Sequence, residues 1–269
     1  MPKKDNANTV LIVLLVVAAF AIGVLWQRNS NLEKAAVQPV PTLQATGTQQ
    51  QDAQKPAQKP EITLEKIKSL FSQDFIAFNS EKGKVLFVEF SDPSCPYCHV
   101  ASGKNPELNK QIGSRFIMDA DGGSYVPPVR EMKKMLDSGS ASYVYLYRNG
   151  HGNGELAAQA LYCANEKDAF WSVHDLLMTN SGYTLINEKV RNDKANIPIL
   201  VQFLGNSVDQ SFMTECLTSG KYAEKLLRDT SIGDSFGIGG TPSFFVNTTV
   251  FPGAYSFTDM KSIVDQSSS

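Results

Sequence analysis

The sequence predicts an α/β domain that is interrupted along the chain by an all-helical insertion. Two segments, 85–90 and 143–147, have the nearly continuous apolar run that is typical of a central strand covered on both faces. From Glu155 to about Phe236 the apolar residues then recur at helical spacing. Strand-like segments return at 243–247 and 250–254. Strands, a long helical block and strands again indicate one sheet-containing domain with helices inserted into it.

The N-terminal residues determine the predicted compartment. Residues 9–26 (Thr9–Trp26) form an uninterrupted apolar stretch, roughly the length of a helix that spans a bilayer. Lys3 and Lys4 precede this stretch and favour a cytoplasmic location for residues 1–8. The alternative is a cleaved signal peptide, because residues 19–21 (AFA) resemble a cleavage site, although the apolar run continues beyond them. Both interpretations place the rest of the chain outside the cytoplasm, on the periplasmic or cell-surface side of the cell membrane.

A polar segment connects this stretch to the folded domain. Residues 27–60 are rich in Gln, Ala, Thr and Pro, and large apolar side chains are almost absent after Leu43. Such a segment cannot bury enough surface to offset the entropy of ordering, so we expect a flexible linker followed by one domain over 61–269. The formal net charge of −2 provides no basic surplus, so we expect no nucleic-acid partner.

Local signals place the remaining elements of the domain. A helix should follow Thr63, whose side chain can cap it, and a first strand is expected over 75–78. The next helix should begin near Cys95, and Pro106 should kink or end it. Another helix is predicted over 127–136, because proline stands at its start and Gly139 follows its end. The last helix is expected over 257–264.

Two of the four cysteines form the run Cys95-Pro96-Tyr97-Cys98. A Cys-x-x-Cys pair can be half of a zinc site, an inert structural disulfide or a redox pair. A structural zinc site needs four ligands, and the other cysteines and the three histidines have no ligand-pair spacing, so we expect no metal. The order of strand, short turn, Cys-Pro-Tyr-Cys and helix favours a redox pair.

The start of a helix changes the chemistry of Cys95. Its unpaired N–H groups and the positive end of the helix dipole stabilise a thiolate and lower the pKa of the thiol. The thiolate is both the attacking species and the better leaving group in disulfide exchange. Cys98, one turn further along, would be more buried and would act as the resolving thiol. Pro96 suits the first turn because it has no N–H to leave unpaired.

Three segments together resemble the DsbA-like thioredoxin-fold proteins. Residues 85–98 (VLFVEFSDPSCPYC) are similar to the active-site segment of that family, and residues 239–247 (GGTPSFFVN) to its cis-proline loop. Residues 161–164 (LYCA), with FW at 170–171 and HD at 174–175, resemble the start of its helical insertion. The resemblance extends over roughly residues 61–267. It implies a thioredoxin fold, with a central mixed sheet flanked by helices and an all-helical insertion at about 151–236.

The resemblance also implies the roles of the residues near the thiols. Cys95 is similar to the exposed nucleophile of the family and Cys98 to its buried partner. Thr241-Pro242 would form a cis peptide that faces the thiols and keeps a backbone edge free to pair with an extended substrate. Substrate contacts are therefore expected from Pro96, Tyr97, Thr241 and Pro242. The alternative is an ordinary trans proline at the start of a strand.

Two further expectations depend on the same resemblance. Glu89 lies six residues before Cys95, where the family often has an acid that relays protons to the buried cysteine. Burial would raise the pKa of Glu89, and the alternative is a side chain that points to solvent. Related proteins often have a disulfide inside the insertion, which implies a structural Cys163–Cys216 pair. The alternative is two separate buried thiols.

Three other polar residues stand close to these motifs. Asp92 is expected to be a solvated or capping acid in the turn before the thiols. His99 could tune the thiol pair, and the alternative is a position on the surface. His174 is expected to be structural, packed beside Trp171.

The predicted activity is thiol:disulfide exchange that introduces disulfide bonds into exported, cysteine-containing polypeptides. This activity needs no cofactor and implies a membrane redox partner that resets the thiol pair. A disulfide isomerase or reductase would use the same site, and Tyr97 and Thr241 also occur in related enzymes of that kind. Dedicated isomerases usually add an N-terminal dimerisation domain where this chain has a linker, which favours a monomeric oxidase. The remaining alternative is a binding or chaperone module with incidental thiols.

Overall fold

The computed structural model describes residues 60–71 and 74–268. The predicted cytoplasmic N-terminus (1–8), the predicted membrane helix (9–26) and the predicted linker up to residue 59 lie outside these residues. Within the described ranges, every helix is too short or too polar to span a membrane.

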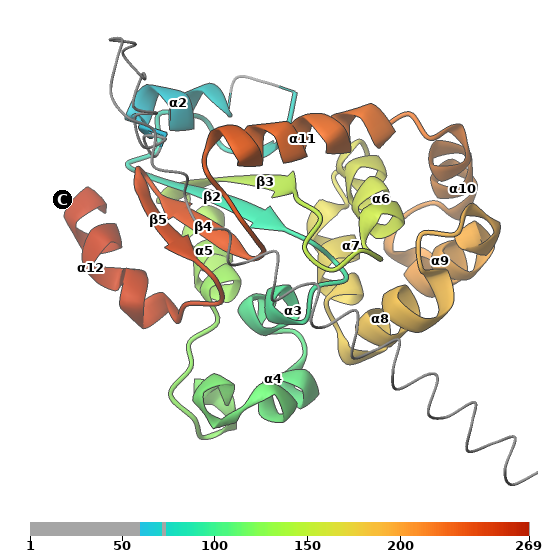
Figure 1. Ribbon diagram of the computed structural model, residues 1–269, viewed down its shortest axis with the longest axis horizontal. Helices are drawn as coiled ribbons and strands as arrows, with labels where there is room; N and C mark the ends of the chain where they lie inside the picture. The colour runs from blue at the N-terminus through green and yellow to red at the C-terminus, as the bar shows by residue number, and fades with distance from the viewer. Residues whose placement is uncertain (1–59, 72–73, 269) are drawn as a thin grey trace, which may run out of the picture. The chain divides into compact units, whose positions relative to one another are not determined.

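Five strands form one mixed sheet in the order β1–β3–β2–β4–β5 (Figure 1). The central strands, β2 (Val85–Ser91) and β3 (Ala141–Tyr147), are parallel. The other neighbouring pairs are antiparallel and involve β1 (Ile76–Phe78), β4 (Ser243–Val246) and β5 (Thr249–Pro252). All five predicted strands form, and the helical insertion lies between β3 and β4, as expected.

Helices cover both faces of this sheet (Figure 1). On one face lie α2 (Leu64–Ser69) and α11 (Ala223–Ser235), and on the other lie α5 (Pro128–Asp137) and α12 (Phe257–Ser268). Two short helices follow β2, namely α3 (Pro96–Ser102) and α4 (Pro106–Ile112). The insertion contains α6 (Glu155–Asn165), α7 (Phe170–Leu177), α8 (Asn180–Thr184), α9 (Ile197–Leu204) and α10 (Gln210–Ser219). Short 3₁₀ segments lie at Ser114–Phe116, Asp119–Asp121, Lys194–Asn196 and Gly205–Ser207, and a π segment at Leu185–Val190.

The central strand β2 is buried over its whole length, which explains its nearly continuous apolar sequence. Successive side chains of a strand point to opposite faces. Leu86 and Val88 pack into the core that contains α2 and α11, whereas Phe87 packs on the side of α5 and α12. By the same alternation, Glu89 and Ser91 point to the side of Phe87. Two polar side chains of β2 are therefore directed into the interior, next to the turn that precedes the thiols.

A disulfide joins α6 to α10 inside the insertion. It links Cys163 to Cys216 with an S–S distance of 2.03 Å. Both cysteines are buried, and they belong to the core that also lines the α5 side of the sheet. The helical insertion is thus attached to the same apolar core as the sheet.

The prediction that Pro106 kinks or ends the helix that begins after Cys95 is wrong, because this helix ends before residue 106. Its last residue is Ser102. Gly103 follows with a φ of 72°, a left-handed conformation that ends the helix and that glycine adopts without a steric penalty. Pro106 is instead the first residue of α4, and the Asn105 side chain accepts a hydrogen bond from the Leu108 N–H to cap that helix. Proline at a first helical position loses no hydrogen bond, so it begins a helix here and does not kink one.

Asp229 on α11 is a buried carboxylate with two hydrogen-bond donors. Its Oδ2 accepts from the Tyr147 N–H at 2.9 Å and from the Tyr162 hydroxyl at 2.6 Å. Its Oδ1 has no hydrogen-bond partner among the described residues. Burial raises the pKa of Asp229 from an ordinary value of 3.8 to about 6, although the two hydrogen bonds favour the ionised form.

Asp229 should therefore make the stability of the fold depend on pH. Between about 4 and about 6 the folded protein keeps a proton that the unfolded chain has released, so the free energy of unfolding falls as the pH rises. In Asp229→Asn, the amide oxygen can accept both hydrogen bonds. We expect this variant to be more stable than the wild type at neutral pH by on the order of 2 kcal/mol, and equally stable or less stable at acidic pH. Urea unfolding at a series of pH values measures the difference.

Asp234→Asn on the same helix is the matched control, because Asp234 is 66% exposed and pairs with Arg148 at the surface. Its loss of stability should be that of a surface ion pair, below about 1 kcal/mol. An Asp229→Asn difference that stays constant from acidic to neutral pH would contradict the assignment of a raised pKa to Asp229.

Candidate active site

The turn after β2 places Cys95 at the start of α3. Cys95 is the residue that precedes the helix, and Pro96 is its first residue. The Cys95 carbonyl accepts hydrogen bonds from the N–H groups of Cys98 (3.1 Å) and His99 (3.3 Å), which closes the first turn. The predicted start of the helix is confirmed, and both cysteines are free thiols.

Cys98 is buried, as the resemblance implies, whereas the expectation of an exposed Cys95 is wrong. Cys98 is 1% exposed and Cys95 only 5% exposed. Thr241 covers Cys95, since the thiol donates a hydrogen bond to the Thr241 carbonyl oxygen at 3.4 Å. The Cys98 sulfur accepts the Asp92 N–H at 3.4 Å. In the described part of the chain, His, Cys, Asp and Glu side chains form no group of three or more that could hold a metal ion.

The two thiols have opposite shifts in acidity. A hydrogen bond from Cys98 lowers the pKa of Cys95 to about 6 against the effect of burial, and Thr241 and the N–H groups of Tyr97 and Cys98 lower it further. Burial raises the pKa of Cys98 well above its ordinary value, and the neighbouring Cys95 raises it further. Cys95 is therefore largely a thiolate at neutral pH, whereas Cys98 holds its proton.

The Thr241–Pro242 peptide is cis and lies against the thiol pair. The structure thus brings together Cys95 and Thr241, which are 146 residues apart in the sequence. Gly150 makes room for this approach, because a Cβ atom there would overlap the Thr241 hydroxyl. A side chain at residue 150 would push the loop of Thr241 away from Cys95.

Asp92 ties the turn before the thiols to the loop after β3. Its Oδ1 accepts hydrogen bonds from the Ser94 N–H (2.8 Å) and hydroxyl (2.7 Å). Its Oδ2 accepts from the N–H groups of Gly150 and His151, both at 2.8 Å. Asp92 is fully buried and bonds the turn and a distant loop, not the first turn of a helix, so its interpretations as a solvated acid and as a helix-capping acid are both wrong. Because the same loop carries Gly150, Asp92 positions both sides of the Cys95–Thr241 contact.

His99 is fully buried, so the alternative of a surface position is wrong. Its ring nitrogens lie 2.8 Å from the Pro93 carbonyl and 2.9 Å from the Met178 carbonyl, and its ring packs edge-on against Tyr183. Burial lowers the pKa of His99 to about 4, so the ring is neutral and donates a hydrogen bond to one of the two carbonyls. His99 therefore connects the turn before Cys95 to the end of α7.

Glu89 lies behind the thiols and is 1% exposed, so the alternative of a solvent-facing side chain is wrong. The Tyr143 hydroxyl donates a hydrogen bond to its carboxylate. Burial raises the pKa of Glu89, while His174, Tyr143 and Ser91 act in the opposite direction. A carboxyl group with a raised pKa can exchange a proton at a pH closer to neutral than an exposed one can.

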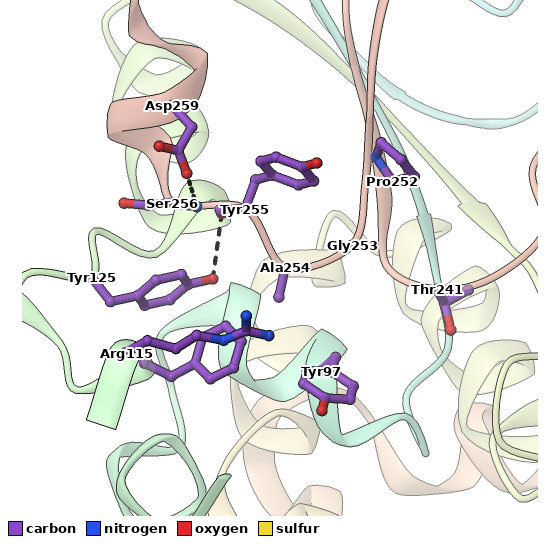
Figure 2. Close-up of a pocket in the computed structure, with 11 residues that line it drawn as sticks. Tyr97, Arg115, Tyr125, Thr241, Pro252, Gly253, Ala254, Tyr255, Ser256 and Asp259 are labelled. Atoms are coloured by element: carbon purple, nitrogen blue, oxygen red, sulfur yellow. Dashed lines mark hydrogen bonds between the residues drawn. The ribbon is translucent and has the colours of Figure 1, made fainter. Parts of the chain in front are cut away.

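A cavity of about 620 Å³ is lined by Tyr97, which stands between the two cysteines in the sequence, and by Thr241, which contacts Cys95 (Figure 2). Tyr97 and Thr241 lie on one side of it, and Tyr125 and Tyr255 lie on the other. Tyr97 and Tyr255 are each 42% exposed. The remaining wall is formed by Arg115, Phe116, Pro252, Gly253, Ala254, Ser256 and Asp259. Only Tyr97 and Thr241 could be identified from the sequence, because the other residues belong to segments that carry no recognisable motif.

Known proteins resemble this chain in sequence. A family model described as thioredoxin matches residues 129–266. The Na(+)/H(+) antiporter NhaA 3 of Salinispora tropica is 26% identical over 184 residues, and the match covers 67% of this chain but only 22% of the antiporter. The chain thus spans about a fifth of the length of that relative. A Rickettsia felis protein with the provisional name protein-disulfide oxidoreductase is 27% identical over 248 residues, which cover 89% of this chain and 77% of that protein.

Solved structures share the fold at low sequence identity. Oxidised BdbD from Bacillus subtilis has a TM-score of 0.51 and 16% identity, with 78% of this chain and 97% of BdbD covered. A variant of alpha-DsbA1 from Wolbachia pipientis has a TM-score of 0.56 and 16% identity, with 77% of this chain and 96% of that protein covered. DsbA from Chlamydia trachomatis has a TM-score of 0.52 and 17% identity, with 73% of this chain and 91% of that protein covered.

These comparisons agree with the architecture. The family match covers just over half of the chain, from α5 to α12. The solved structures extend the likeness to nearly the whole described part of the chain, which includes β2 and α3. The chain therefore belongs to the thioredoxin family and has the DsbA-like form of its fold.

Proposed function

We propose that this chain is an extracytoplasmic thiol:disulfide oxidoreductase that introduces disulfide bonds into exported polypeptides. The observation that carries the proposal is the asymmetry of the thiol pair. Cys95 has a pKa of about 6 and lies against the Thr241 carbonyl, whereas the adjacent Cys98 is buried and keeps its proton. The provisional name of the Rickettsia felis relative agrees with this chemistry.

The difference in acidity between Cys95 and Cys98 favours donation of a disulfide to a substrate. With the pair oxidised, a substrate thiolate attacks the Cys95 sulfur, the Cys95–Cys98 bond breaks, and Cys98 leaves and takes up a proton. A second substrate thiolate then attacks the substrate sulfur of the mixed disulfide, and Cys95 leaves. A thiol of low pKa is a good leaving group, so the low pKa of Cys95 favours this second step.

The cavity beside the thiols suits a polypeptide substrate. Its exposed tyrosines, Tyr97 and Tyr255, offer broad apolar contacts, and Arg115 and Asp259 in its wall add one charged group of each sign. Tyr97 and Thr241 line this cavity next to Cys95, which supports a role in substrate contact for them and for the adjoining Pro96 and Pro242. Such a surface fits many unfolded sequences, as a disulfide donor for exported proteins requires.

Two observations support an extracytoplasmic location. Disulfides persist in oxidising compartments, and the chain has the Cys163–Cys216 pair. The apolar stretch at residues 9–26 precedes the domain and would hold it at the cell membrane. A membrane redox partner would then reoxidise the thiol pair after each turnover, and the domain would act as a monomer.

The reduction potential of the Cys95–Cys98 pair distinguishes an oxidase from a reductase. A low pKa of Cys95 stabilises the reduced form, which makes the disulfide more oxidising. We expect a potential less negative than about −200 mV when the full chain is equilibrated with glutathione buffers. A value near about −270 mV would instead favour a reductase. Oxidation of a reduced model protein, followed in parallel, measures the forward reaction.

A further inference from the structure

Unpartnered polar atoms gather on the α7 side of the sheet. Four buried atoms there have no hydrogen-bond partner among the residues that the structure describes, namely Ser91 Oγ, the Tyr145 hydroxyl, Trp171 Nε1 and His174 Nε2. Buried polar groups are nearly always hydrogen-bonded, and an exception usually indicates bound water or a functional role. Their occurrence in one region therefore needs a physical explanation.

Two of these atoms adjoin Glu89 on the sheet. Ser91 is two residues further along β2, so both side chains point to the same face. Tyr145 is the residue paired with Glu89 on β3. The Ser91 hydroxyl forms no hydrogen bond of normal length with a described residue, but it lies close enough to Glu89 and Cys98 to lower the pKa of each, which places it between the buried thiol and the carboxyl group.

The other two atoms extend the group from the sheet to α7. The Trp171 ring lies 5.3 Å from the ring of Tyr143, whose hydroxyl donates to Glu89. The His174 ring lies 5.3 Å from the Trp171 ring, and His174 is close enough to Glu89 to oppose the rise in the pKa of that carboxyl group. A series of polar side chains thus extends from Cys98 past Glu89 to His174 inside an otherwise apolar core.

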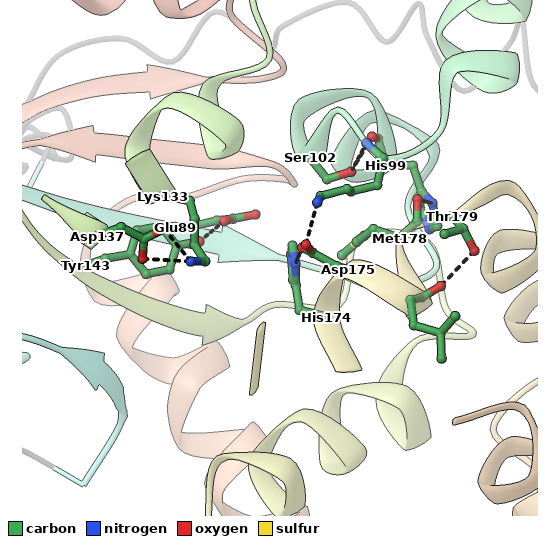
Figure 3. Close-up of polar contacts among 12 residues, drawn as sticks. Glu89, His99, Ser102, Lys133, Asp137, Tyr143, His174, Asp175, Met178 and Thr179 are labelled. Carbon is green, nitrogen blue, oxygen red and sulfur yellow. Dashed lines mark hydrogen bonds and ion pairs between the residues drawn. The ribbon is translucent and has the colours of Figure 1, made fainter. Parts of the chain in front are cut away.

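His174 leads from this region to the surface (Figure 3). Its Nδ1 lies 3.1 Å from Oδ1 of Asp175, whose side chain is 36% exposed and pairs with Lys104. Asp175, Lys104 and Trp171 line a surface cavity of about 190 Å³. Ser102, the last residue of α3, lines it too. Since α3 begins after Cys95, this cavity lies about 10 Å along the helix from the thiol end.

We propose that His174 relays protons between Glu89 and solvent through this second cavity, so that Cys98 can lose or gain a proton while a substrate covers Cys95. The inference rests on the proposed function. Ionisable groups face this path at its inner end (Cys98, Tyr143, Tyr145), beside it (His99) and at its outer end (Asp175, Lys104, Arg130, Lys133, Lys134).

The relay serves the step in which Cys98 resolves a mixed disulfide on Cys95. The Cys98 thiolate attacks the Cys95 sulfur, the Cys95–Cys98 bond forms, and the other sulfur leaves as a thiolate with the bonding electron pair. The proton from Cys98 passes to the Glu89 carboxylate and then to Nε2 of His174. Nδ1 of His174 in turn releases its proton towards Asp175 and solvent. The two electrons of the protein thiols reduce the bound disulfide, so no further oxidant is needed.

Reaction of the reduced full chain with an excess of 5,5′-dithiobis(2-nitrobenzoate) separates the two halves of this chemistry. The first coloured thiolate is released when Cys95 attacks the reagent, and the second when Cys98 resolves the mixed disulfide. We expect His174→Phe, which keeps an aromatic ring, to leave the first release within about twofold of the wild type and to slow the second by about tenfold or more. Glu89→Gln should act in the same direction. In His174→Phe the second release should also depend on buffer concentration, because protons must then reach an external base.

Val173→Ala on the same helix is the matched control, because it removes buried volume but no polar atom. It should lower stability and leave the ratio of the two release rates unchanged. If the second thiolate is released by His174→Phe at the same rate as by the wild type, at every pH and buffer concentration, the proposal is overturned. If that variant does not fold, Asp175→Asn decides, with a several-fold slower second release expected and an unchanged rate counting against the relay. Absence of the second release in the wild type would instead refute the proposed function.

Discussion

Replacement of Cys95 with serine is expected to abolish the oxidation of protein substrates, with a loss of about three orders of magnitude or more. Serine has no accessible anion at neutral pH, whereas the Cys95 thiol has a pKa of about 6 and is mostly ionised. Cys98 cannot take its place, because it is 1% exposed and burial raises its pKa. Transfer of disulfides from the oxidised full chain to a reduced model protein measures the loss.

Cys98→Ser is the informative counterpart of this variant. It keeps the nucleophile but removes the thiol that resolves the mixed disulfide, so covalent complexes between Cys95 and substrate should accumulate. They would appear as larger species on non-reducing gels and disappear in the Cys95→Ser/Cys98→Ser double variant. Undiminished substrate oxidation by Cys95→Ser would refute the enzymatic function and favour a binding or chaperone module.

The parts of the site that follow local signals could be predicted from the sequence. The start of α3 is one example, because proline is favoured at the first helical position and the apolar strand β2 ends just before it. The acidity of Cys95 follows partly from that position. The positions of the strands and of the helical insertion along the chain follow from the alternation of strand and helix patterns, whereas the order of the strands in the sheet comes from the structure.

The partners of the buried polar residues could not be predicted in the same way. Asp92 accepts hydrogen bonds from residues 58 and 59 positions away, and His99 contacts the carbonyl of Met178, 79 positions away. A polar residue in a turn has no sequence signal that distinguishes solvent from a distant backbone group. Burial of Asp92 and His99 depends on how the insertion packs on the sheet, which is a property of the tertiary structure.

The near-burial of Cys95 has the same origin. The sequence places Cys95 at a helix start, where side chains are commonly accessible, but Thr241 comes from a loop 146 residues later and covers it. This contact also depends on Gly150, whose lack of a side chain lets the Thr241 hydroxyl approach. The exposure of a nucleophile is therefore decided by three segments that meet only in the folded chain.

Removal of the Cys163–Cys216 disulfide is expected to give the largest loss of stability. The cysteines are 53 positions apart, and the chain entropy that such a bond removes from the unfolded state corresponds to about 4 kcal/mol. The double variant Cys163→Ala/Cys216→Ala avoids buried hydroxyl groups. Urea unfolding of the full chain should show a free energy of unfolding lower by roughly that amount.

The loss should not extend to the chemistry of the thiol pair. The disulfide joins α6 to α10, whereas the acidity of Cys95 depends on α3 and on the loop of Thr241. In the folded double variant, the rate at which Cys95 reacts with a disulfide reagent should therefore match that of the wild type within about twofold. A loss of stability below about 1 kcal/mol would show that the unfolded chain gains little freedom when the bond is removed. A large change in Cys95 reactivity would instead mean that the insertion controls the position of the turn before Cys95, which it contacts through the Met178 carbonyl at His99 and through the Asn187 side chain at the Ser94 carbonyl.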